Sequence, residues 1–296
     1  MRVLVAGASG LIGTELVRRL RAEGHDVLRL VRREPQSQDE RAWTPSARMI
    51  DVGLLDETDA VVNLAGASLN RLPWTPAHRR RILASRLEAT GTLAEAMRQT
   101  SSPPAVFVSG SAVGYYGDRP GQVLTESSTK GTGFLSDVVD AWERAAHLAP
   151  QATRVVTVRT GVVIGRGGAM APLLPLARAG LVGPIAGGRQ HWPWVSLRDE
   201  AAAIAHLLTS TLSGPVNVVG PEPATAADVL RALTAAVHRP YGLPLPRAAV
   251  SLGLGEAGRE LLLADQRVLP QRLLDDGFVF RDATVQDAMA QLVAAA

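Results

Sequence analysis

Three glycines near the start of the chain have the spacing of a phosphate-binding turn. Gly7, Gly10 and Gly13 lie in GASGLIG, directly after the apolar run Arg2–Gly7 and at the beginning of a segment with helical spacing. Glycine permits a tight turn at the first place, backbone approach to a pyrophosphate at the second, and close packing of helix on strand at the third. The free N–H groups and the positive dipole end of the following helix also favour phosphate. The residues expected to form this dinucleotide site are Gly7, Ser9, Gly10, Leu11, Ile12 and Gly13.

Arginines at the end of the second expected strand bear on the identity of the dinucleotide. A carboxylate that binds the ribose 2′-hydroxyl of NAD usually lies about 20 residues after the glycine turn. Here the strand expected at Asp26–Val31 is followed by Arg32 and Arg33, with no acidic residue at its tip. Guanidinium groups can bind a 2′-phosphate through paired hydrogen bonds, so these arginines favour NADP over NAD. The alternative is that they are ordinary surface residues of a chain that has 30 arginines and one lysine.

Two further segments are expected to complete the dinucleotide site. Asp51 is expected to flank the adenine. Leu64, Ala65 and Gly66 lie at the end of the strand expected at Ala60–Leu64, in AVVNLAGAS, where small residues permit the dinucleotide to approach the backbone closely.

Strands and helices alternate through the first half of the chain. Short apolar runs predict buried parallel strands, and apolar residues at helical spacing predict the helices between them. The strands are expected at Arg2–Gly7, Asp26–Val31, Ala60–Leu64, Ala105–Ser109 and Arg154–Val158. Long helices are expected at Pro76–Arg98 and roughly at Thr132–Leu148. This alternation predicts an α/β protein with a doubly wound parallel sheet of the Rossmann-like kind.

The composition changes after about residue 165, where glycine and proline become more frequent. We expect a dinucleotide-binding domain over residues 1–165, with α/β elements returning over about 190–237. These include a strand, a loop and a helix within Asn217–Val237, the helix being capped by Thr225. The remainder of 166–296 is expected to form a smaller C-terminal α/β cap that contributes to the substrate site.

The composition also limits the classes of function. Apolar residues make up 46% of the chain, which excludes a wholly disordered protein. The net charge is only +3 and the arginines are scattered, so we expect no nucleic-acid partner. The absence of cysteine excludes disulfides and thiolate catalysis, and no His/Asp/Glu cluster has metal-ligand spacing. No long apolar run or signal peptide is visible, so we expect no membrane segment and a cytoplasmic location.

The order of several motifs resembles the extended short-chain dehydrogenase/reductase superfamily along the whole chain. These motifs are GASGLIG, NLAG, VSGSAVGYYGD, VRTGVVIGRGG and WPWVSLRDEAAAI. The segments RLPWTPAHRRRILASRLEAT, GFLSDVVDAWE, GGRQHWPW and VLPQRLLDDGFVF more narrowly resemble an atypical branch, the NAD(P)-dependent epimerase family. Its members carry a C-terminal domain of unknown function, here expected at about 243–290. They are commonly called nucleoside-diphosphate-sugar epimerases, and some are called cell-division inhibitors.

The resemblance implies a catalytic serine and a Tyr-x-x-x-Lys pair, but the pair is absent. None of the tyrosines has a lysine four residues later, and Phe134 and Val138 occupy the matching places. Ser111 matches the serine at the end of the fifth strand. We expect Tyr115 or Tyr116 to relay a proton, the alternative being that both are packed in an aromatic turn. Two residues of the next loop are candidates to assist, namely Glu126 and Lys130.

Two functions follow from these observations. The first is an NADP(H)-dependent oxidoreductase or epimerase that acts on a small polar, perhaps nucleotide-linked, substrate. The second is a non-catalytic regulatory or binding protein that holds NADP(H), which the missing Tyr–Lys pair favours. Trp192 and Trp194 either stack on such a substrate or hold the returning strand to the core.

A homodimer through the two long helices is compatible with either function. Arg79, Arg80 and Arg81 crowd the first of these helices and make an apolar interface less obvious, so a monomer is the alternative.

Overall fold

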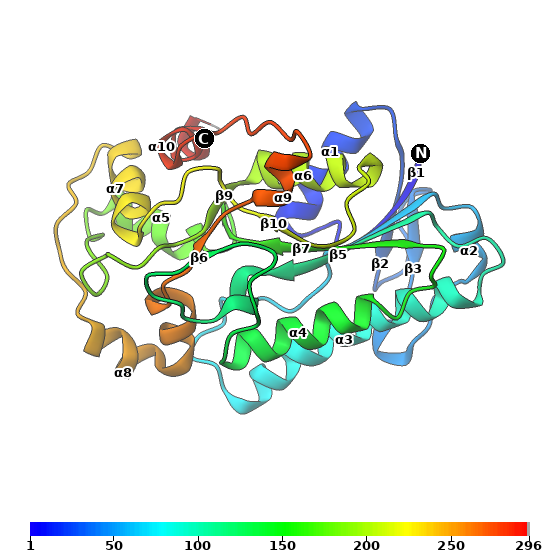
Figure 1. Cartoon of the computed structure of the whole chain (residues 1–296), viewed down its shortest axis with the longest axis horizontal. Helices are drawn as coiled ribbons and strands as arrows, with labels where there is room; N and C mark the ends of the chain where they lie inside the picture. Colours follow the sequence, from blue (N-terminus) through cyan, green and yellow to red (C-terminus); the bar gives the residue numbers. More distant parts are fainter. Residues whose placement is uncertain (295–296) are drawn as a thin grey trace.

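A seven-stranded parallel sheet organises the computed structural model, which describes residues 1–294 (Figure 1). The strand order is β10-β7-β5-β4-β1-β2-β3. The strands are β1 (Arg2–Ala6), β2 (Asp26–Val31), β3 (Glu40–Ala42), β4 (Ala60–Asn63), β5 (Val106–Ala112), β7 (Arg154–Thr160) and β10 (Gly214–Val218). The chain order reverses between β1 and β4, and a doubly wound sheet opens a ligand crevice at the carboxyl ends of the strands at such a point.

Helices cover both faces of this sheet because its strands are apolar on both sides. Val3 and Val5 of β1 pack against α1 (Leu11–Ala22) and α6 (Leu197–Thr209). Leu4 and Ala6 point to the other face, toward α3 (Pro76–Gln99) and the end of α4 (Phe134–Ala146). Figure 1 shows α3 and α4 side by side along this second face. The short α2 (Gly53–Asp56) precedes β4.

The last third of the chain builds a smaller lobe with its own core at one end of the sheet (Figure 1). Trp192 and Trp194 are 4% and 1% exposed and pack there with Leu230 and Met289, so these tryptophans hold the returning strand to the core. The helices of the lobe are α5 (Met170–Arg178), α7 (Ala226–Ala236), α8 (Arg247–Gly258) and α10 (Val285–Ala294), whereas Leu273 of the short α9 (Gln271–Asp275) packs in the core of the main sheet. Its short strands form two parallel pairs, β8 (Val162–Ile164) with β9 (Trp194–Ser196), and β6 (Val123–Leu124) with β11 (Arg267–Val268).

The predicted fold class, a Rossmann-like doubly wound sheet with a smaller C-terminal α/β lobe, is confirmed. The helix within the predicted segment Asn217–Val237 begins after Thr225, which shares a capping box with Asp228. The fifth strand, β5, is longer than expected and continues to Ala112, because small residues pair there with the end of β7. This extension places Ser111 inside the sheet.

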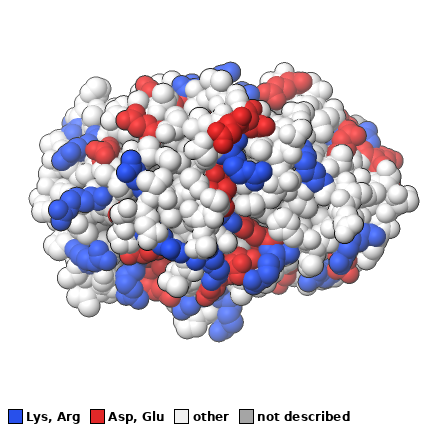
Figure 2. All heavy atoms as spheres, viewed as in Figure 1, with Lys and Arg blue, Asp and Glu red and all other residues white. Residues whose placement is uncertain are grey.

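The molecule carries charged side chains of both signs on its surface. On the face drawn in Figure 2, basic and acidic side chains are interspersed. Within residues 1–294, the helices are all too short or too polar to cross a membrane. The same residues contain no group of three or more His, Asp or Glu side chains arranged to hold a metal ion.

Candidate functional site

The glycine turn joins β1 to α1 and can hold only glycine at two of its places. Gly7 has a φ of +79°, and a Cβ there would lie 2.6 Å from the carbonyl carbon of Leu64. A Cβ on Gly13 would lie 2.2 Å from the Gly7 oxygen, because the first turn of α1 packs directly on the loop. The Gly10 N–H donates to the Gly7 oxygen at 3.0 Å, and Gly10 begins the helix. The turn therefore leaves a cradle of bare backbone, which suits a phosphate group.

A cavity of about 920 Å³ opens in front of this cradle, at the point where the strand order reverses. The predicted residues that line it are Gly7, Ser9, Gly10, Arg32, Arg33, Leu64, Ala65 and Gly66. Leu11, Ile12 and Gly13 lie just behind them in the first turn of α1. The volume suits a ligand of dinucleotide size, since ligand pockets commonly measure roughly 300–1,000 Å³.

Asp51 is not among the residues that line the cavity. Its Oδ1 accepts a hydrogen bond from the Gly53 N–H at 3.0 Å and so helps to begin α2. Trp43 and Pro45, which precede it, line the cavity instead. This hydrogen bond uses one of the two carboxylate oxygens, and the expectation that Asp51 flanks the adenine stays a prediction.

The two arginines after β2 differ in their surroundings. Arg33 donates through both Nη atoms to the two oxygens of the buried Glu40, at 2.8 Å each. This pairing, together with the Gln36 N–H, lowers the pKa of Glu40. Arg32 is exposed, and no carboxylate lies within 4.0 Å of it in the described part of the chain. Arg32 is therefore available to a ligand, whereas Arg33 is already paired with Glu40 and so stabilises the loop between β2 and β3.

Ser111 belongs to a buried polar cluster at the carboxyl ends of β5 and β7. Its hydroxyl donates to Glu143 Oε1 at 2.6 Å. Glu143 also accepts from Arg159, through Nε and Nη2 at 2.8 Å each. The Arg159 guanidinium lies 3.5 Å from the centre of the Tyr115 ring and donates to the Tyr116 hydroxyl at 3.0 Å. We call these five residues the Ser111 cluster; they do not line the 920 Å³ cavity.

The two tyrosines of the cluster are not equivalent. Tyr116 is fully buried and donates its hydroxyl to Asn217 Oδ1 at 2.7 Å. Burial raises the pKa of Tyr116 to about 12. Tyr116 is therefore packed and hydrogen-bonded in the core, and the expected proton relay by Tyr115 or Tyr116 stays a prediction. The Tyr115 ring is half-buried against Arg159, and no residue within 1–294 hydrogen-bonds its hydroxyl.

The two loop residues expected to assist have other partners. Glu126 is buried, and its Oε1 accepts the backbone N–H of Asn217 at 3.0 Å. Lys130 pairs with Asp137 at 2.6 Å at the surface. Glu126 therefore fixes β10. Lys130 is half-buried in its ion pair with Asp137, and Asp137 together with the nearby Asp140 and Tyr115 raises the pKa of Lys130.

Apolar residues occupy the places that the superfamily gives to its tyrosine and lysine. Phe134 packs edge-on against Trp74, and Val138 is buried with Ile82 and Leu135. Lys130, the one lysine of the chain, lies on the loop before α4 and not at the place of Val138. The standard proton relay is thus absent from the structure as well as from the sequence.

Arg86 on α3 was not expected from the sequence. Its guanidinium lies over the Trp142 ring at 5.0 Å and donates to the Ala67 and Ile82 carbonyl oxygens. Burial lowers its pKa to about 10. Arg86 therefore supports the loop after Gly66 from behind.

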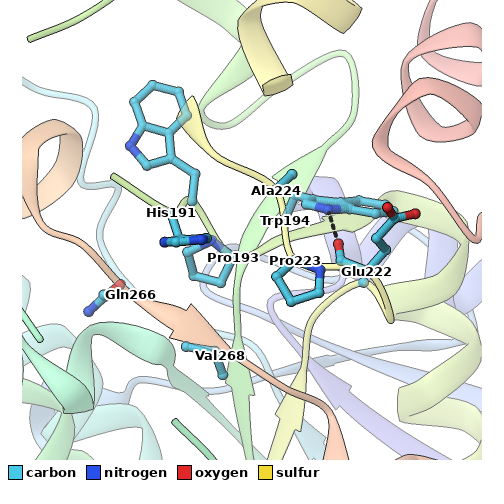
Figure 3. Close-up of a pocket in the computed structure, with 10 residues that line it drawn as sticks. His191, Pro193, Trp194, Glu222, Pro223, Ala224, Gln266 and Val268 are labelled. Atoms are coloured by element: carbon cyan, nitrogen blue, oxygen red, sulfur yellow. Dashed lines mark hydrogen bonds between the residues drawn. The ribbon is translucent and has the colours of Figure 1, made fainter. Parts of the chain in front are cut away.

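A second, narrow cleft lies between the segment His191–Trp194, the loop after β10 and the strand β11 (Figure 3). His191, Trp194, Glu222 and Gln266 line it, and Trp194 Nε1 donates to the Glu222 carbonyl oxygen at 2.9 Å. His191 Nδ1 lies 2.8 Å from Asp265 Oδ1. The tryptophan ring fills most of the space, so this cleft has no room for a substrate.

Known proteins match the chain along nearly its whole length. The model of the NAD dependent epimerase/dehydratase family matches residues 3–220, and that of a domain of unknown function matches 245–292. An epimerase family protein of Mycobacterium tuberculosis is 40% identical over 290 residues, covering 97% of this chain and 96% of its own. Human epimerase family protein SDR39U1 is 39% identical over 299 residues, covering 99% and 100%.

Two solved structures are similar in both fold and sequence. A crystal structure of human SDR39U1 (isoform 2) with NADPH has a TM-score of 0.91 and 36% identity, and the match covers 99% of each chain. A nucleoside-diphosphate sugar epimerase from Corynebacterium glutamicum has a TM-score of 0.81 and 31% identity, over 99% of this chain and 58% of that one.

Proposed function

The chain belongs to the NAD dependent epimerase/dehydratase family, and from this premise we propose that it is an NADP(H)-binding oxidoreductase or epimerase. The observation that carries the proposal is the bare backbone cradle at Gly7–Gly13, which opens into a cavity of dinucleotide size. The NADPH in the similar crystal structure of human SDR39U1 supports the choice of dinucleotide. The predicted division into residues 1–165 and 166–296 is part of this proposal.

The residues of the cavity suit the separate parts of NADP(H). Gly7, Ser9 and Gly10 would hold the diphosphate at the start of α1, where the N–H groups of the first helical turn have no partner within the helix. Arg32 would bind the 2′-phosphate, next to an Arg33 that keeps its loop in place. Leu64, Ala65 and Gly66 would form the wall beneath the nicotinamide half. When bound, the nicotinamide supplies the capacity to donate or accept hydride.

The Ser111 cluster is the candidate for substrate contact. Glu143 fixes the Ser111 hydroxyl by accepting its proton, and the Ser111 oxygen would then accept a hydrogen bond from a substrate hydroxyl. Tyr115 would relay the proton, and Arg159 holds its ring from one face. We propose a small polar substrate, with a nucleotide sugar as one possibility suggested by the Corynebacterium glutamicum relative.

The alternative is a regulatory or binding protein that holds NADP(H) without turnover. It is favoured by the apolar packing of Phe134 and Val138, which occupy the places where the superfamily has its tyrosine and lysine. Dimerisation through α3 and α4 and a cytoplasmic location stay predictions under either function.

The first experiment is titration calorimetry of NADPH and NADH with wild type, Arg32→Ala and Arg98→Ala. Arg98 is exposed at the far end of α3 and serves as the matched control. Loss of a charged hydrogen bond should weaken NADPH binding by about tenfold or more in Arg32→Ala and leave NADH binding unchanged. Failure of wild type to bind either nucleotide would overturn the proposal.

A second experiment separates the two functions. Wild type loaded with NADP(H) is screened against carbonyl compounds and sugar nucleotides, following NADPH absorbance and epimer ratio. Turnover that falls in Tyr115→Phe and Ser111→Ala supports an enzyme. Tight NADPH binding without turnover of any compound supports the regulatory function.

A further inference from the structure

One side of the first half of α3 faces the dinucleotide cavity. His78, Arg81, Ser85 and Ala89 all line it, and their spacing of three or four residues places them on a single helical face. The loop before the helix adds Ser68 and Arg71. The cavity thus has a second wall, made of Ser68, Arg71, His78, Arg81, Ser85 and Ala89, which the sequence analysis did not assign to the dinucleotide.

Three consecutive arginines at this part of α3 have three different surroundings. Arg79 pairs with Glu256 at 2.9 Å and lies 4.3 Å from the centre of the Phe134 ring. Arg80 is exposed and does not line the cavity. Arg81 lines the cavity, because each residue turns the helix by about 100°. The position of Arg81 is therefore specific to the cavity and is not a general property of an arginine-rich helix.

The charges of the cavity are only partly neutralised. Arg29 pairs with Asp39, and Arg33 pairs with Glu40. In the described residues, by contrast, no carboxylate lies within 4.0 Å of the other three lining arginines, which are Arg32, Arg71 and Arg81. Glu88 is the one lining acid besides Glu40. The cavity therefore keeps an excess of positive charge contributed by three separate segments.

We propose that Arg71 and Arg81 bind phosphate groups of the dinucleotide, jointly with Arg32. This inference rests on the proposed NADP(H) site and extends it to a second wall. A concave surface with charge of one sign attracts an anion more strongly than a flat one, and guanidinium groups match phosphate oxygens in pairs. The groups available are the diphosphate and the 2′-phosphate, and the two are distinguished by comparing NADPH with NADH.

The test is calorimetric titration of Arg81→Ala, Arg71→Ala and the double variant with NADPH and NADH. Arg80→Ala is the matched control, since it removes the same charge from the next position. We expect Arg81→Ala to weaken NADPH binding by about tenfold and Arg80→Ala to change it by less than about twofold. Equal losses for NADPH and NADH assign Arg81 to the diphosphate, and a loss for NADPH alone assigns it to the 2′-phosphate.

The salt dependence of NADPH binding is a second readout, which distinguishes a lost phosphate contact from an indirect effect of the substitution. The logarithm of the NADPH dissociation constant rises with salt, and the slope should be smaller in Arg81→Ala if a phosphate contact has been removed. Thermal unfolding checks that each variant is folded.

Two results would overturn the inference, and they are distinguishable. In the first result, Arg81→Ala, Arg71→Ala and the double variant all bind NADPH as wild type does, while Arg32→Ala does not. The proposed phosphate contacts of Arg71 and Arg81 are then wrong, and the proposed NADP(H) site stands. If wild type binds neither nucleotide, the proposed function fails as well.

Discussion

The Ser111 hydroxyl donates to Glu143 Oε1 over 2.6 Å, which ties the serine of the proposed substrate site to the carboxylate that neutralises Arg159. We expect Glu143→Gln to lower the free energy of unfolding by about 3–5 kcal/mol, since it leaves a buried guanidinium without its counter-charge. Urea unfolding followed by circular dichroism measures this. The control is Asp140→Asn, which breaks the exposed ion pair with Arg144 and should cost at most about 1 kcal/mol. Similar small losses in both variants would contradict a structural role for the buried pair.

The two neighbouring tyrosines should respond differently to loss of the hydroxyl. Tyr116→Phe leaves the buried Asn217 oxygen and one Arg159 N–H without a partner, so we expect a loss of about 1–3 kcal/mol in the free energy of unfolding. Tyr115→Phe removes no hydrogen bond within residues 1–294, so its free energy of unfolding should stay within about 0.5 kcal/mol of the wild-type value. The same urea titrations decide this. A larger loss in Tyr115→Phe would show that its hydroxyl has a structural partner.

Glu200 should make stability depend on pH. It is fully buried on α6, and burial raises its pKa from 4.5 to about 8 although Thr160 donates to its Oε1 at 2.7 Å. Below pH 4.5 the Glu200 carboxyl is protonated in both the folded and the unfolded chain, so its ionisation does not affect the free energy of unfolding. As pH rises from 4.5 to about 8, ionisation favours the unfolded chain, so wild type should lose about 1.4 kcal/mol per pH unit relative to Glu200→Gln. Above about pH 8 the difference should level off.

The check is a series of urea titrations of wild type and Glu200→Gln at several pH values. A constant difference between the two proteins from pH 5 to pH 8 would show that Glu200 stays ionised in the folded state.

The features that the sequence predicted correctly are those with a local signal. The strand β1, the glycine turn and the start of α1 are adjacent in the chain, and each requires a particular residue type at a particular place. The helix after Thr225 is another example, because a capping box is formed by residues three apart.

The features that were missed depend on contacts between distant segments. Ser111 and Arg159 become neighbours only through the register of β5 with β7, and Glu143 reaches them from α4. Arg81 could have been suspected from its helical spacing with Ser85 and Ala89, but the cavity it lines is built by other segments.

Gly13→Ala should abolish nucleotide binding, because its Cβ would lie 2.2 Å from the Gly7 oxygen and 2.8 Å from Ala8 Cα. Relief of this clash must move either the turn or the start of α1, and both belong to the proposed diphosphate cradle. We expect NADPH affinity to fall by more than about tenfold and stability to fall by several kcal/mol. Calorimetry and urea unfolding measure the two effects.

Gly24→Ala is the control. Gly24 lies just after the other end of α1 and has a φ of +83°, and nothing lies within 4 Å of its Cβ position. It should therefore cost about 1–2 kcal/mol of stability and leave NADPH affinity unchanged. Wild-type affinity in Gly13→Ala would place the diphosphate elsewhere than at this turn.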